Sequence, residues 1–174
     1  VLDKAGLSPS VMVGANVPQF NGACLIGQSD YLAIEADEYQ NKLKYFQPRL
    51  VLLNNIDYDH PDYFPTADDY KNVFIEFIKR IPRQGILVAN FDDPVIRKIA
   101  PANTRAKVLG YAIDEQADYV AYDLKAVNGE QFFKVKLAAG EDDSDDEILA
   151  DSELGDFMIK LPGRHNISNA LAVI

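Results

Sequence analysis

Cysteine is almost absent from this sequence, and so are long apolar runs. A single cysteine, Cys24, excludes a disulfide within the 174 residues and fits a reducing cytoplasm. No apolar run approaches the ~20 residues that a membrane-spanning helix requires. The first ten residues also lack the basic and apolar regions of a signal peptide. The sequence therefore predicts a cytoplasmic protein without a membrane partner.

Positive charge is scarce as well. The chain carries 17 Lys and Arg against 27 Asp and Glu, which gives a net charge of −10. Such a chain does not suit non-specific binding to nucleic acid, which depends on neutralising phosphates. Residues 141–147 hold six of the acids, and without them the net charge is −4. We expect this segment to be a solvated loop and residues 141–153 to be mobile, because the glycine and ligand spacing of a calcium loop are missing.

Several motifs of common catalytic sites are missing too. No Gly-x-x-x-x-Gly-Lys-Ser/Thr phosphate loop occurs, and neither a zinc-ligand spacing nor a Ser–His–Asp arrangement is visible. What remains is an ordinary globular composition, with 48% apolar and 25% charged residues. A chain of this length is expected to form one domain with a core of its own and at most a small appendage.

Hydrophobic patterns predict that strands and helices alternate over most of the chain. The predicted strands are residues 11–13, 31–36, 50–53, 86–89, 106–110 and 157–161. The predicted helices are residues 66–81, 93–100 and 167–174. The first helix is the clearest, because its apolar side chains recur on one face, Thr66 can cap it, and Asp69 lies where a capping box has its acid. Strands that alternate with helices imply parallel pairing with right-handed crossovers.

The pattern changes in the last third of the chain. Residues 118–127 and 131–138 alternate between apolar and polar side chains, and they flank Asn128-Gly129, a strong signal for a hairpin turn. The predicted fold class is therefore α/β. We expect a mostly parallel sheet flanked by helices, with a small antiparallel β appendage at about 118–161.

Candidate ligands follow two of the predicted strands. Glu35 ends the strand 31–36, and His60, one of only two histidines, lies in the polar turn after the strand 50–53. Ligands bind at the carboxyl ends of parallel strands, so we expect Glu35 and His60 to follow neighbouring buried strands and face one crevice. They could bind a divalent ion, for which a histidine favours manganese or zinc, or they could transfer a proton. Glu35 could also be a solvated strand end.

Asparagine side chains form a second group of candidates. Asn166 and Asn169 lie three residues apart, which places them on one face of the last predicted helix. A side-chain amide both donates and accepts hydrogen bonds, so it can read an adenine edge. Alternatively, His165 or Asn166 caps the helix and the group only forms its solvated face. Asn54 and Asn55 could bind phosphate or ribose, or only satisfy the strand end.

Four segments resemble the central domain of the Mur ligases, which are cytoplasmic, ATP-dependent, amide-bond-forming enzymes of peptidoglycan synthesis in the cell wall. The segments are EADEY (35–39), NNIDYDHPDYF (54–64), DDPVIRKI (92–99) and LPGRHNISNALAVI (161–174). They stand in the family's order and cover nearly the whole chain. Within the family, they are most similar to the branch that adds L-alanine to UDP-N-acetylmuramate.

The resemblance implies roles for individual residues. The family's magnesium ligands fall on Glu35 and His60. The family's adenine- and ribose-contacting motif falls on His165, Asn166 and Asn169, and Asn55 is kept beside them as a candidate nucleotide contact from the residues alone. ATP and Mg2+ are the implied cofactors, and UDP-N-acetylmuramate and L-alanine the implied substrates of the parent enzyme. In the family, ATP phosphorylates the muramoyl carboxylate, and the incoming amine then attacks the acyl phosphate.

The chain differs from the family because the phosphate loop and the flanking domains are missing from the 174 residues. The family's phosphate loop precedes a helix, and residues 1–7 are expected to be the end of that helix, with Gly6 as its cap. We therefore expect residues 1–174 to be a partial central domain of a longer ligase. It would lack the phosphate loop and the N- and C-terminal domains, and it would be inactive alone.

Three alternatives stay open at this point. Glu38-Tyr39 and Asn54-Asn55 also resemble the branch of the family that joins murein tripeptide to UDP-N-acetylmuramate. The chain could instead be a non-catalytic nucleotide-binding or scaffold domain. A metal hydrolase that uses Glu35 and His60 is a weaker possibility, because no further ligands cluster near them in the sequence.

Overall fold

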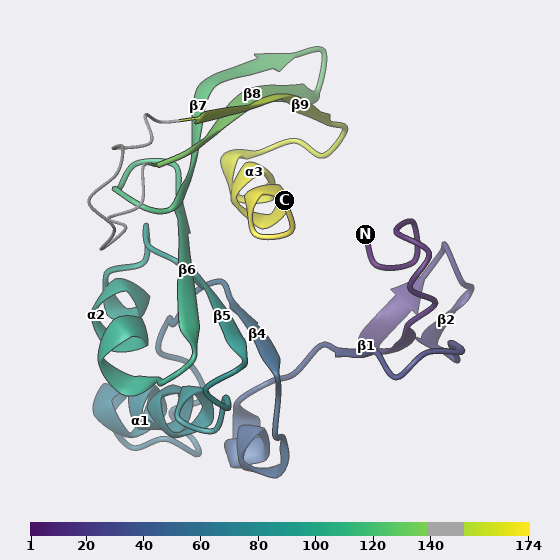
Figure 1. The fold of residues 1–174 in the computed structure, drawn as a ribbon. Coiled ribbons are helices and arrows are strands. Elements are labelled where there is room, and N and C mark those ends of the chain that lie inside the picture. The colour runs from purple at the N-terminus through teal and green to yellow at the C-terminus, as the bar shows by residue number, and fades with distance from the viewer. Residues whose placement is uncertain (139–151) are drawn as a thin grey trace. The chain divides into compact units, whose positions relative to one another are not determined.

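Two separate sheets organise the computed structural model, which describes residues 1–138 and 152–174 (Figure 1). The chain divides into two compact units, Val1–Tyr45 and Phe46–Ile174. The larger unit holds a six-stranded sheet of order β4-β5-β6-β7-β8-β9. Its strands are β4 (Leu50–Leu53), β5 (Ile86–Asn90), β6 (Lys107–Ala112), β7 (Tyr119–Val127), β8 (Glu130–Leu137) and β9 (Ser152–Ile159). The strands from β4 to β7 are parallel, whereas β7, β8 and β9 are antiparallel.

The predicted fold class is confirmed, and the antiparallel part continues the main sheet. β7 pairs with β6 in parallel, with Tyr111 opposite Tyr119, so the hairpin strands extend the parallel strands without a break. The turn between β7 and β8 has positive φ at both central residues, 51° at Asn128 and 84° at Gly129, as the predicted hairpin requires. Most of the acidic segment predicted to be mobile lies outside the described residues, and its last two residues, Ser152 and Glu153, begin β9.

Helices cover both faces of the six-stranded sheet. They are α1 (Ala67–Ile78), α2 (Pro94–Asn103) and α3 (Arg164–Leu171). α2 contacts α1, β5 and β6, while α3 contacts β6, β7 and β8, and Figure 1 shows α3 on the opposite face from α1 and α2. Side chains alternate accordingly: Leu87 and Ala89 are buried on one face of β5, and Val88 packs toward α3 on the other. Of the helices that the structure describes, none is long and apolar enough to cross a membrane.

α1 forms as the capping signal predicts. Thr66 precedes the helix with extended backbone, and its hydroxyl accepts a hydrogen bond from the Asp69 amide at 3.1 Å. The helix ends at Ile78, before the predicted limit at residue 81, but Ile81 is still buried at 2% exposure. α1 therefore contributes its apolar face to the core on its side of the sheet.

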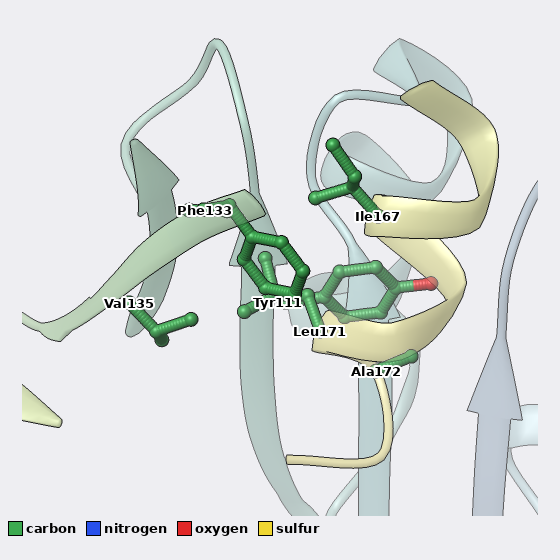
Figure 2. Packing of buried hydrophobic residues seen from close by; sticks show 7 residues of the cluster. Tyr111, Phe133, Val135, Ile167, Leu171 and Ala172 are labelled. Atoms are coloured by element: carbon green, nitrogen blue, oxygen red, sulfur yellow. The ribbon is translucent and has the colours of Figure 1, made fainter. Parts of the chain in front are cut away.

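A second core fixes α3 on the opposite face. Its buried members are Tyr111, Ala121, Phe133, Val135, Ile167, Leu171 and Ala172 (Figure 2). Ile167 and Leu171 lie one helical turn apart on α3 and face the sheet, where Figure 2 shows the Tyr111 and Phe133 rings beside them. Burial of each such side chain contributes ~1.5–3 kcal/mol, so this cluster is the main attachment of α3.

The smaller unit holds a three-stranded sheet of order β2-β1-β3. Its elements are β1 (Ser10–Val17), β2 (Gly22–Leu25), β3 (Leu32–Ile34) and a short 3-10 segment η1 (Tyr39–Tyr45). β1 is longer than predicted, and β2 and η1 were not predicted. Residues 1–7 form no helix, but Gly6 donates to the Asp3 carbonyl at 2.9 Å and Leu7 to the Leu2 carbonyl at 3.1 Å. These two bonds are those that close a helix C-terminus, as expected for the Gly6 cap.

The prediction that Glu35 and His60 follow neighbouring buried strands is wrong. Glu35 follows β3, which pairs with β1, whereas the strand before His60 is β4, which pairs with β5. β3 is also not buried, since Leu32 is 61% exposed. An apolar run identifies a strand but not its pairing partner, and Leu32 in β3 pairs with Ser10 in β1.

Candidate functional site

The carboxyl ends of β4, β5 and β6 lie at one edge of the larger sheet, because these strands are parallel neighbours. Side chains tie the loops at this edge together. The Asn90 side-chain amide donates to the Asn54 backbone carbonyl at 2.9 Å, and this bond joins the end of β5 to the loop after β4. The Ile56 amide donates to Asp93 Oδ2 at 2.8 Å, which joins the loop after β4 to the start of α2. We define this edge, together with the first turn of α3, as the candidate site.

Asp92 connects β5 to the loop after β6. Its carboxylate accepts hydrogen bonds from three backbone amides, those of Ile113 at 2.7 Å, Asp114 at 2.9 Å and Glu115 at 3.1 Å. The Asp114 side chain forms an ion pair with Arg164, the first residue of α3. The start of α3 is thereby attached to the same edge as the loops after β4 and β5.

Tyr111 lies beneath this edge as a buried polar group. Its side chain is 1% exposed, and its hydroxyl donates to Asn54 Oδ1 at 3.0 Å. The Ser168 hydroxyl, on α3, donates to the same phenol oxygen. Burial raises the pKa of Tyr111 to about 12, against the lowering effect of the Ser168 bond and with a smaller contribution from the Asp92 charge. The tyrosine is therefore neutral and serves as a hydrogen-bonded link between β4 and α3.

His60 occupies a tight turn whose backbone is well defined. Its φ is 55°, in the left-handed region that few non-glycine residues adopt. The Asp59 carboxylate accepts from the His60 amide at 2.7 Å, and the His60 carbonyl accepts from the Tyr63 and Phe64 amides, both at 2.9 Å. The Tyr58 hydroxyl donates to the Phe64 carbonyl at 2.6 Å and closes the turn. The imidazole is thus presented from a turn closed by four hydrogen bonds, with its side chain 36% exposed.

The other predicted ligands have simpler surroundings. Asn55 is exposed, and its amide lies 3.4 Å from Asp57 Oδ2. In the smaller unit, Glu35 Oε2 accepts a hydrogen bond from the Gly14 amide at 2.8 Å. Across residues 1–138 and 152–174, no three His, Cys, Asp or Glu side chains lie together as metal ligands. Metal binding at Glu35 and His60 therefore stays a prediction, as does the nucleotide contact of Asn55.

α3 carries the other three predicted residues, but neither His165 nor Asn166 caps it. The N-cap is Gly163, and the helix begins at Arg164. Gly163 has φ of 100°, and a Cβ atom there would lie 2.7 Å from His165 Cε1, so the imidazole rests against this glycine. The Asn166 amide donates to the Pro162 carbonyl at 2.7 Å. His165 and Asn169 are exposed on the same helix, so the structure brings these residues together on one element.

Some residues of the site were not predicted from the sequence. Asp92 and Asp93 lie in a segment that resembles a family motif, but nothing in the pattern indicated which amides they would bind. Tyr111 directly follows the predicted strand 106–110, which the structure extends to Ala112, and only the structure reveals its two hydrogen-bond partners. A tyrosine instead of phenylalanine at a buried strand position was the one available signal.

Known proteins match this chain over almost its whole length. Residues 16–174 match the Mur ligase middle domain. The UDP-N-acetylmuramate–L-alanine ligase of Persephonella marina is 31% identical over 174 residues, which are 100% of this chain and 34% of the relative. The ligase of the same name from Caldicellulosiruptor bescii is 37% identical over 172 residues, 99% of this chain and 35% of the relative. The chain thus spans about a third of the length of these relatives.

Solved structures share the fold. A UDP-N-acetylmuramate-alanine ligase from Thermotoga maritima matches with a TM-score of 0.79 at 20% identity, over 99% of this chain and 35% of that chain. The UDP-N-acetylmuramate:L-alanyl-gamma-D-glutamyl-meso-diaminopimelate ligase from Neisseria meningitides also matches with a TM-score of 0.79, at 25% identity, over 99% of this chain and 53% of that chain. The mostly parallel sheet, its antiparallel extension and the sequence match agree, and the chain belongs to the Mur ligase family as a middle domain.

Proposed function

We propose that this chain is the ATP-binding middle domain of a ligase that joins L-alanine to UDP-N-acetylmuramate. The observation that carries the proposal is the alignment of ligases of that name over the whole chain, at 31% and 37% identity. The chain corresponds to 34% and 35% of those relatives, so the parts that hold the sugar and the amino acid would lie on other domains. The ligase would act in the cytoplasm, in peptidoglycan synthesis.

The reaction of the parent enzyme has two steps. The γ-phosphoryl group of ATP is transferred to the muramoyl carboxylate, which gives an acyl phosphate and ADP. The amine of L-alanine then attacks the carbonyl carbon, the bond to the phosphate oxygen breaks, and inorganic phosphate leaves as the nitrogen loses a proton. Both steps depend on positioning and on charge neutralisation rather than on covalent chemistry by the protein.

The chain's own residues would bind and orient the nucleotide. Asn169 and His165 are exposed on α3, whose first residue, Arg164, is paired with Asp114 at the carboxyl edge of the sheet, and the Asn169 amide could donate to and accept from an adenine edge. Asn166 already donates to the Pro162 carbonyl, so its carbonyl oxygen is the atom that would accept from a nucleotide. Asn55 lies in the loop after β4, where it would contact phosphate or ribose.

Magnesium is compatible with the donors that the chain offers. Mg2+ keeps several waters and uses one or two protein ligands together with nucleotide phosphates, so a set of three protein ligands is not required. His60 would be a ligand presented by its hydrogen-bonded turn in the larger unit, and Glu35 is a separate candidate ligand in the smaller unit. When bound, Mg2+ would supply positive charge that offsets the negative charge developing during transfer.

A second candidate is the related ligase that uses a tripeptide in place of L-alanine. The supporting observation is the Neisseria meningitides structure, whose TM-score of 0.79 equals that of the alanine ligase and whose identity is 25% against 20%. The middle domain holds no residues that we assign to the amine substrate. The choice between the two therefore depends on an activity measurement.

The test is phosphate release by the full-length protein with ATP, UDP-N-acetylmuramate and either L-alanine or L-alanyl-γ-D-glutamyl-meso-diaminopimelate. We expect turnover with L-alanine. Asn169→Ala should raise KM for ATP about tenfold through the lost hydrogen bond, and His60→Ala should lower kcat at least ~10-fold. Asn103→Ala is the control, because the Asn103 side chain donates to the Ile99 carbonyl at the far end of α2. Turnover with the tripeptide alone, or with neither amine, would contradict the proposal.

A further inference from the structure

The Tyr111 hydroxyl is a buried polar group that the proposed reaction does not use. The ring belongs to the apolar cluster under α3, where Ile167 and Leu171 pack against it (Figure 2). A phenylalanine would fill almost the same space, so the hydroxyl is not needed for packing. A buried hydroxyl is tolerated only when its hydrogen bonds are made, and this one makes two, to Asn54 and to Ser168.

These two partners belong to the two segments that carry the candidate nucleotide contacts. Asn54 directly precedes Asn55 in the loop after β4. Ser168 lies on α3 between Asn166 and Asn169. The residues are 114 positions apart in the sequence, yet one phenol oxygen joins them through the core of the larger unit.

The two hydrogen bonds of Tyr111 restrict the position of α3 in a way that apolar packing does not. The contacts of Ile167 and Leu171 are non-directional, so they hold α3 against the sheet but tolerate small shifts and rotations of the helix. Hydrogen bonds are directional, with distances near 2.7–3.0 Å and restricted angles. Tyr111 lies on β6, and its hydroxyl bonds to Asn54, at 3.0 Å, and to Ser168 on α3, so the two bonds together fix the height of α3 relative to the loop after β4.

We propose that Tyr111 is a positioning residue that sets the register between the base-contacting helix α3 and the phosphate-side loop after β4. The inference rests on the proposed function, since it assumes that α3 contacts the base. A nucleotide spans both segments, so its base reaches Asn169 in the correct place only when the two segments keep this register. Loss of the link lowers the contribution of the base to binding, and therefore lowers the preference for adenine over guanine.

The test compares Tyr111→Phe with the unchanged full-length protein, with ATP and with GTP as the phosphoryl donor. We expect the variant to raise KM for ATP about threefold to tenfold, the effect of one lost hydrogen bond, and to lower the ratio of kcat/KM for ATP over GTP by a similar factor. Ser168→Ala removes the hydrogen bond between α3 and the Tyr111 hydroxyl, at a half-buried helix position. It replaces Tyr111→Phe as the test variant if Tyr111→Phe does not fold. The double variant should resemble the stronger single variant, because both break the same link.

Tyr122→Phe is the matched control. Tyr122 lies on the neighbouring strand β7, and its hydroxyl is hydrogen-bonded to Glu153 on β9. This variant should leave the ATP-over-GTP ratio unchanged. If Tyr111→Phe lowers only the melting temperature and keeps the ratio, Tyr111 is purely structural and the inference is overturned. If Asn169→Ala also leaves the KM for ATP unchanged, the proposed role of α3 fails instead, so the two failures are distinguishable.

Discussion

Asp93 stabilises two elements with one carboxylate. Its Oδ1 accepts from the amides of Val95 and Ile96, at 2.8 and 2.9 Å, and so caps α2. Its Oδ2 accepts from the amide of Ile56, at 2.8 Å, and so holds the loop after β4. The position of the candidate phosphate-side loop thus depends on a residue 37 positions further along the chain.

Substitution at Asp93 should separate these two contributions. Asp93→Ala removes both and leaves the Ile56 amide unsatisfied, so we expect a loss of about 2–4 kcal/mol in the free energy of unfolding. Asp93→Asn keeps the cap oxygen but replaces the other oxygen with a donor, so we expect about half that loss. Urea denaturation measures both. The control is Asp68→Asn, an exposed acid in the first turn of α1, which should change little. Equal losses for Ala and Asn would show that the cap contributes nothing.

The raised pKa of Tyr111 predicts a pH dependence of stability. The folded-state pKa of about 12 exceeds the ordinary value of 10.0, so the folded protein binds the proton more tightly than the unfolded chain. This contribution is fully present below pH 10 and is lost as the pH rises from about 10 to about 12. The stability difference between the unchanged chain and Tyr111→Phe should be constant from pH 8 to pH 9. It should then fall by about 1.4 kcal/mol per pH unit above pH 10. A constant difference up to pH 11 would contradict the burial of the hydroxyl.

The helices differ in how well the sequence predicts where they begin. α1 was predicted from Thr66 and the apolar stripe, because both signals are local. α3 was predicted with the wrong cap, because its start is set by Gly163, whose conformation depends on the turn before it and on the His165 ring beside it. A capping side chain is visible in a sequence, whereas a glycine that makes room for a neighbouring ring is not.

Gly163→Ala should disturb α3 beyond the cost of backbone strain. Alanine at φ of 100° is strained, and its Cβ would lie 2.7 Å from the His165 ring and displace it. Gly155→Ala is the matched control, since φ is 127° and no atom lies within 4 Å of the added Cβ. We expect both variants to lose stability, but only Gly163→Ala to shift the NMR resonance of His165 Cε1–H and to raise KM for ATP in the full-length protein. An unchanged His165 resonance would contradict the contact.

At the scale of the whole molecule, local patterns predicted the elements but not all of their partners. β4, β5 and β6 were predicted to be parallel because helices separate them, and that topology has few alternatives. No such constraint acts on β3, whose three residues pair with β1, so its place in a separate sheet could not be predicted. The site residues likewise divide into those that a local pattern predicts and those that depend on tertiary packing. His60 follows a strand that the sequence predicts, whereas the Tyr111 link depends on how α3 packs on β6, β7 and β8, which only the folded chain determines.

At the scale of the whole chain, a phosphate-binding loop of the Gly-x-x-x-x-Gly-Lys-Ser/Thr type is missing from the 174 residues. In P-loop enzymes, such a loop supplies backbone amides and a lysine that cradle the β- and γ-phosphates. In this chain the proposed contacts to ATP are limited to the base and to one side of the phosphates, so the expected affinity for ATP is low.

We therefore expect the 174-residue chain to fold but to be catalytically silent. Both faces of its six-stranded sheet are covered by apolar clusters, and a domain needs only ~5–15 kcal/mol of net stability. Positioning of the reacting groups can contribute ~7–11 kcal/mol to lowering a barrier, and no residue of this chain is assigned to the carboxylate or the amine. Calorimetric titration with ATP and Mg2+ should show a dissociation constant well above the micromolar range. Phosphate release with UDP-N-acetylmuramate and L-alanine should equal the blank, with the full-length protein as the active control. Micromolar binding or turnover by the chain alone would show that the phosphate loop is dispensable and that the proposed division of roles is wrong.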